Sequence, residues 1–161
     1  MARRRSIAID EEHARLLEEL ARRYGVPMSS YLRGLLEAAW EAEERGANAA
    51  SLLRRAVALE ALLRLGAVPL PQQLLARCPL ALLHGEARRL GAGLRALVGR
   101  EAVYELLALL AERTGAGLVE YRRIILPDPG RPEAQLILGI AEGAGLEARA
   151  DGVAEIHAPE V

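Results

Sequence analysis

Lysine and phenylalanine are both absent from this 161-residue chain, and all 21 of its basic residues are arginine. Abundant arginine is compatible with a heat-adapted source, although the proteome-wide signal of such sources includes lysine. The acidic residues number 22, so the formal net charge is only -1. A chain without a global positive field has no general attraction to nucleic acid, so any binding to DNA must come from local clusters of arginine.

Cysteine is limited to Cys78, which excludes a disulfide framework within the chain and is typical of a reducing compartment. No apolar run is long enough to span a bilayer. The arginine-rich start is followed by Asp10, Glu11 and Glu12, where a secretory signal would need an apolar segment. We therefore expect a cytoplasmic protein with no membrane partner. Its hydrophobic content of 52% is ample for a packed core.

Residues 3–10 (RRRSIAID) are predicted to form a short basic strand, because Ile7 and Ile9 alternate with small or polar neighbours. An unpaired strand is not stable alone in water, and no partner strand is predicted within the next hundred residues. Asp10 is well placed to cap a following helix. The expected partner of the strand is the same strand in a second copy.

Two amphipathic helices are predicted after the strand. The first ends at Gly25, and the second opens with Pro27 and ends near Gly46 after an acidic stretch. Their apolar faces comprise Leu16, Leu17, Leu20, Ala21 and Tyr24 in the first helix, and Tyr31, Leu32, Leu35, Leu36, Ala39 and Trp40 in the second. One strand and two helices hold too little core for a stable monomer, so we expect a homodimer.

Residues 3–46 resemble the ribbon-helix-helix family of DNA-binding transcriptional regulators. The matching features are the alternating strand that ends in Asp10, the helix that ends at Tyr24–Gly25, and the second helix, which opens with Ser29 and carries leucines. The resemblance implies that two strands pair antiparallel into a ribbon that enters the DNA major groove. It implies a DNA-binding and dimerisation domain at residues 1–47, and a transcriptional regulator such as a repressor as the function.

The resemblance also assigns roles to individual side chains. The implied residues are Arg4, Ser6 and Ala8 for base edges; Arg3, Arg5, Met28, Ser29 and Ser30 for phosphates; and Ile7, Ile9, Leu16, Leu20, Leu32, Leu35 and Leu36 for the dimer core. Arginine can donate two parallel hydrogen bonds to guanine, serine can bond to several bases, and alanine offers only apolar contact. The free N–H groups at a helix start suit a phosphate.

Two residues depart from the family pattern. Pro27 stands where serine or threonine commonly caps the second helix, so the phosphate clamp lacks one hydroxyl and one N–H. Ala8 occupies a reading position where polar residues are usual. We therefore expect low sequence specificity. A dimerisation module that does not bind DNA is the alternative that these two residues favour.

Residues 48–100 are predicted to form a helical linking segment that is broken by prolines. A break within its longest helix is expected at Gly85 or Gly91. The expected helices cover about 49–65 and 80–98, with a helical turn or two at 72–77.

Residues 101–161 are predicted to form a small α+β domain, which makes the whole fold mainly α with small β elements. Its expected elements are a helix over 101–113, a strand over 118–126, a helix over 132–143, and a hairpin of 146–150 with 153–157 around Asp151-Gly152. We expect this domain to bind an unknown effector or to build a tetramer. The alternative is that this domain binds a protein partner, as in antitoxins. Antitoxin extensions, however, are usually short and unfold when alone.

Neither a catalytic site nor a metal or cofactor site is predicted. His13, His84, His157 and Cys78 lack the close spacing of metal ligands. The glycines around Gly143 lack the preceding strand turn of a dinucleotide site, and there is no nucleophile elbow. We therefore expect that the protein is not an enzyme.

Overall fold

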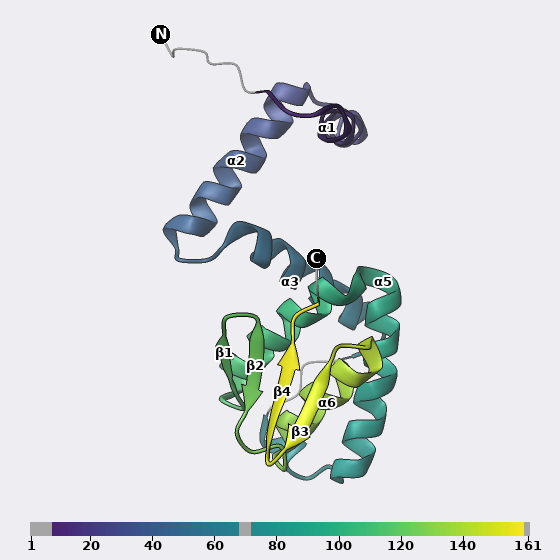
Figure 1. The fold of residues 1–161 in the computed structure, drawn as a ribbon. Coiled ribbons are helices and arrows are strands. Elements are labelled where there is room, and N and C mark those ends of the chain that lie inside the picture. The colour runs from purple at the N-terminus through teal and green to yellow at the C-terminus, as the bar shows by residue number, and fades with distance from the viewer. Residues whose placement is uncertain (1–7, 68–71, 160–161) are drawn as a thin grey trace. The chain divides into compact units, whose positions relative to one another are not determined.

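The computed structural model describes residues 8–67 and 72–159. It is mainly helical with one small antiparallel sheet, which confirms the mainly α fold with small β elements (Figure 1). The chain divides into two compact units, Met1–Ala50 and Ser51–Val161. Residues 3–7 of the strand predicted over 3–10 lie outside the described residues, and residues 8–10 have no regular secondary structure.

The N-terminal unit consists of α1 (Glu11–Arg23) and α2 (Met28–Glu44), as predicted. Asp10 caps α1, because its carboxylate accepts a hydrogen bond from the His13 N–H at 3.0 Å. That bond and a further one from the His13 ring hold the pKa of Asp10 below its usual value. Gly25 then ends α1 with φ of 64°, a conformation that favours glycine.

The helices of the C-terminal unit are α3 (Ala49–Arg64), α4 (Gln72–Leu75), α5 (Leu80–Thr114) and α6 (Pro132–Ala144). The interruption predicted at Gly85 or Gly91 is wrong, because both residues lie in regular helix; the backbone leaves helical geometry at Gly99, with φ of 78°, between the helices predicted over about 80–98 and 101–113. Gly91 is inside regular helix and serves packing instead. A Cβ atom there would lie 2.1 Å from the carbonyl oxygen of Ile140 on α6.

The single strand predicted over residues 118–126 is wrong, because two strands form a hairpin there. They are β1 (Leu118–Glu120) and β2 (Arg123–Leu126), joined at Tyr121, whose φ of 47° turns the chain. The predicted hairpin around Asp151-Gly152 is confirmed as β3 (Ala148–Asp151) and β4 (Val153–His157). The four strands lie in the order β1-β2-β4-β3, and all neighbours are antiparallel.

Helices α5 and α6 cover one face of this sheet (Figure 1). The core between them includes Leu94, Leu106, Leu107, Ile124, Leu126, Ile137, Ile140 and Ile156, all fully buried. The expected boundary between residues 100 and 101 falls inside α5. Side chains from both sides of it share one core, so residues 51–161 form a single unit.

Two glycines of α6 bring its backbone against α5. A Cβ atom on Gly143 would lie 1.9 Å from the carbonyl oxygen of Arg88, and one on Gly139 would lie 2.6 Å from that of His84. Together with Gly91 they form a glycine seam in which two helix backbones touch directly. Any larger residue in this seam must push the helices apart.

Candidate nucleic-acid interface

Of the side chains predicted to contact base edges, the structure describes only Ala8. Arg3, Arg4, Arg5, Ser6 and Ile7 lie outside the described residues. Ala8 is described and exposed. The assignment of the ribbon face therefore stays a prediction.

The start of α2, predicted to hold a phosphate, is open to solvent. Met28, Ser29 and Ser30 are all exposed, and Pro27 supplies no side-chain cap. The Pro27 carbonyl accepts the Ser30 and Tyr31 N–H groups at 2.9 and 3.0 Å. The N–H groups of Met28 and Ser29 have no backbone acceptor among the described residues. Two free donors therefore stand at the positive end of the helix dipole, where an anion is favoured.

The predicted dimer-core side chains that the structure describes are exposed or half-buried in the single chain. Leu20 and Leu32 are half-buried, whereas Ile9, Leu16, Leu35 and Leu36 are exposed. Within residues 8–50 only Ala21 is buried. Leu16 is 53% exposed and Trp40 is 67% exposed. The N-terminal unit thus has almost no core of its own.

The geometry between α1 and α2 is held by two local contacts. The rings of Tyr24 and Tyr31 stack with their centroids 5.5 Å apart. The Val26 N–H donates to the carbonyl of Ala21 at 3.1 Å, which closes the end of α1. The two helices are therefore fixed in place by a turn and a ring stack rather than by a packed interior.

Charge on this unit is unevenly distributed between the helices. On α1 the arginines Arg15, Arg22 and Arg23 each pair with a glutamate four residues earlier, so its surface is nearly neutral. Arg33 on α2 is exposed and has no ion-pair partner in the described part of the chain. Sequence reasoning missed Arg33, because its lack of a partner becomes visible only once the ion pairs of its neighbours are known.

In the C-terminal unit, His84 links α5 to α6. Its Nδ1 lies 3.0 Å from Gln135 Oε1, and its Nε2 lies 3.2 Å from Glu142 Oε2. The Gln135 side-chain amide donates to the Pro129 carbonyl at 2.7 Å, and this bond turns its oxygen toward His84. These partners are 51 and 58 residues away from His84 in the sequence, so spacing gives no sign of them.

Glu133 is the one buried charged residue recorded among the described residues. The Gln72 amide donates to Glu133 Oε1 at 2.7 Å, and this bond holds the pKa of Glu133 below its usual value. Arg131 Nε lies 3.5 Å from its other oxygen. Gln72 also donates to the Thr114 carbonyl, so one side chain ties α4 to α5 and α6.

A third polar cluster joins α3 to α5. Glu105 accepts from Ser51 at Oε2 and from Arg54 at Oε1, and Arg55 Nε lies 3.4 Å from Oε2. The neighbouring Tyr104 hydroxyl is buried and has no hydrogen-bond partner in the described part of the chain. Burial raises the pKa of Tyr104.

The histidines and the cysteine do not come together. His13 bonds to Asp10, His84 to Gln135 and Glu142, and His157 lies beside Glu155. Cys78 is half-buried. Across residues 8–67 and 72–159, no three side chains of the histidine, cysteine or carboxylate type are grouped to hold a metal ion. No helix in these ranges combines the length and apolar character needed to cross a membrane.

Comparison with protein-family models, with curated proteins and with solved structures gives no match to this chain.

Proposed function

We propose that the protein is a dimeric DNA-binding transcriptional regulator whose N-terminal unit acts as a ribbon-helix-helix module. The observation that carries this proposal is the missing core of that unit. Two well-formed amphipathic helices keep most of their large apolar side chains in solvent, and only Ala21 is buried. Exposed apolar surface of this kind marks an association surface. A second copy would bury the leucines of α1 and α2.

DNA would contact three parts of the same unit. The arginines at positions 3–5 supply the local positive charge that the whole chain lacks. The free N–H groups at the start of α2 can hold a phosphate, and the unpaired Arg33 adds a further cation nearby in sequence. The arginines of α1 are paired with glutamates, so we expect α1 to contribute little to the affinity for DNA.

The antitoxin-like alternative is less well supported. Residues 51–161 have a core of their own, with Leu94, Leu107, Ile137 and Ile156 fully buried. A segment that folds by itself is expected of a regulatory or oligomerisation domain, rather than of an extension that orders on a toxin. A dimerisation module without DNA binding would form the same dimer but would not bind a DNA duplex.

The experiment measures affinity for a mixed-sequence duplex by fluorescence anisotropy at several salt concentrations. If Arg3, Arg4 and Arg5 of both subunits neutralise phosphates, log affinity falls against log salt with a slope of up to about -5. Replacing all three by alanine should abolish the salt-dependent binding. Arg113→Ala is the matched control, because it removes an exposed arginine from the other unit.

Oligomeric state is measured on the same samples by analytical ultracentrifugation. A dimer that binds no DNA would support the module without DNA binding, and a monomer would contradict the proposal. Selection of binding sites from genomic fragments would then separate a specific regulator from a nonspecific one.

A further inference from the structure

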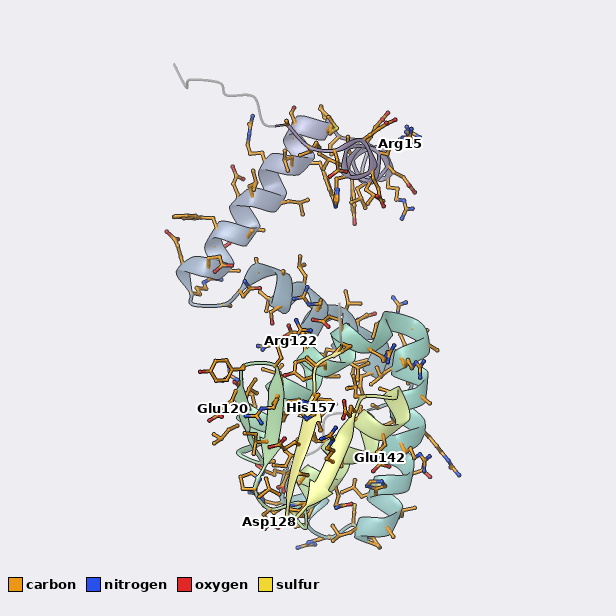
Figure 2. All side chains as sticks on the ribbon, in the orientation of Figure 1. Arg15, Glu120, Arg122, Asp128, Glu142 and His157 are labelled. Carbon is orange, nitrogen blue, oxygen red and sulfur yellow. The ribbon has the colours of Figure 1, made fainter. Side chains whose placement is uncertain are left out.

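A groove of about 700 Å³ is lined by all three residues of β1, which is an edge strand of the sheet. It is bounded by the end of α5, by β1 itself and by the loop that follows β2. Glu120 lies at the hairpin end of β1, and Asp128 lies in the loop near the start of β1 (Figure 2). Glu112, Leu118 and Arg131 complete the side chains that matter here.

The outer edge of β1 has backbone hydrogen-bonding groups that point away from β2. The Ala158 N–H donates to the Arg122 carbonyl at 2.8 Å. In an antiparallel pair the backbone N–H and C=O groups of every second residue face the same neighbour, so those of Ile124 and Leu126 also face β4. Arg123 and Ile125 must then face β1, where they pair with Glu120 and Leu118. The N–H and C=O of Val119, the residue between them, therefore point away from β2. No strand of the described ranges pairs with that edge.

The groove is acidic. Three carboxylates line it, against one guanidinium. Arg131 is already engaged, because it donates to the Gly115 carbonyl at 2.8 Å and lies beside Glu133. Glu112 and Glu120 have no ion-pair partner in the part of the chain that the structure describes. Within the described residues, the Asp128 carboxylate accepts only the Gly130 N–H, at 3.0 Å. Negative charge in the groove is thus left without a partner.

Apolar surface is available on the same edge. Leu118 is 60% exposed, and it stands on the sheet face that also carries its partner Ile125. The side chains of an added strand would alternate between this face of the sheet and the opposite face. The edge thus offers backbone hydrogen-bonding groups, an apolar contact and carboxylates at both ends, which together suit an extended basic peptide.

We propose that the β1 edge binds an extended peptide segment rich in arginine or lysine, which adds to the sheet beside β1. The main-chain groups of Val119 would bond to the peptide backbone, and the carboxylates would select basic side chains. A second copy of β1 fits less well, because it would bring the same carboxylates together. Nucleic acid is repelled by the same charge.

The test uses the full chain without DNA and a labelled eight-residue peptide of alternating arginine and valine. Anisotropy should show saturable binding that weakens with salt, and a glutamate–valine peptide should not bind. A peptide N-methylated at alternate residues keeps its charge but loses the hydrogen bonds of one edge. It should bind at least tenfold more weakly.

Variants locate the site. Val119→Pro removes the outward N–H, and a proline is tolerated at a sheet edge, so affinity should fall at least tenfold. Glu120→Gln combined with Asp128→Asn should reduce both affinity and salt dependence, whereas Glu86→Gln, outside the groove, should change neither. Absence of binding, or equal binding of the N-methylated peptide, would overturn the proposal even if Val119→Pro failed to fold. A change of oligomeric state in Val119→Pro would identify the edge as a contact between copies, which also overturns it.

Discussion

Replacing Gly143 by alanine should destabilise the C-terminal unit far more than a single methyl group suggests. The added Cβ would lie 1.9 Å from the Arg88 carbonyl oxygen and 3.0 Å from the Ala92 nitrogen. Carbon and a carbonyl oxygen approach to about 3.3 Å at closest, so α5 and α6 must separate by more than 1 Å at this point. Neither neighbour can turn aside, because both atoms belong to the backbone.

The cost follows from what lies beside the seam. Separation of the helices loosens the contacts of Leu94, Ile137 and Ile140, which are fully buried between them. Overpacking of a core costs about 1–3 kcal/mol and sometimes more. Alanine gains about 1 kcal/mol over glycine in a helix interior, which offsets part of that cost. Because both crowded atoms belong to the backbone, we expect the upper end of this range, and a net loss of about 2 kcal/mol in the free energy of unfolding.

Gly85→Ala is the matched control, because it makes the same change in α5 where nothing lies within 4 Å of the new atom. It should gain about 0.5–1 kcal/mol. Urea denaturation followed by circular dichroism would measure both variants. A Gly143→Ala protein within about 0.5 kcal/mol of the wild type would refute the backbone contact between α5 and α6.

Three further changes have defined outcomes. Tyr121→Gly should stabilise the fold by about 0.5–1 kcal/mol, because glycine adopts the positive φ at this position without strain. The tyrosine side chain is 95% exposed, so its removal costs few contacts. The thermal midpoint should rise, and a lower midpoint would contradict this prediction. Tyr104→Phe removes a buried hydroxyl without a partner among the described residues, so urea denaturation at pH 7 should show equal or up to about 1 kcal/mol greater stability. Because its raised pKa delays ionisation of Tyr104 in the folded state, the wild type should also lose more stability than this variant as the pH rises above about 10. The lowered pKa of Glu133 stabilises the fold above about pH 4.5, and this contribution is lost as the pH falls further. Gln72→Ala removes the hydrogen bond that lowers this pKa, so the variant should lose less stability than the wild type on acidification. An equal loss of stability in both proteins would contradict this role of Gln72.

Local signals in the sequence were enough to place most helix ends. Asp10 caps α1 as its position predicts, and Gly25, Gly46 and Gly66 take the positive φ expected after a helix end. These outcomes depend on residues within one turn of each other, so they can be deduced without the tertiary fold.

The errors arose where a distant partner decides the outcome. Gly85 or Gly91 was expected to interrupt the helix over 80–98, but both lie in regular helix, and the backbone of α6 is what requires a glycine at position 91. The β1–β2 hairpin was missed because Tyr121 and Arg122 carry no turn signal, and a tyrosine at positive φ is uncommon.

The candidate sites divide along the same line. The basic strand and the apolar faces of α1 and α2 could be identified from the sequence, since charge clusters and helical periodicity are local properties. The open edge of β1 could not, because it depends on which strands pair. The link from His84 to Gln135 likewise exists only after α5 and α6 have come together.

The glycine seam between α5 and α6 also has a consequence for how the chain folds. α6 has 13 residues and carries two glycines, so it is too short and too weak a helix to persist alone in water. It must form while docking onto a segment of α5 some fifty residues earlier in the chain. Closing so long a loop before any helix is stable slows folding. We therefore expect the docking of α6 to be part of the folding transition state, with the hairpin of β3 and β4 completing the sheet afterwards.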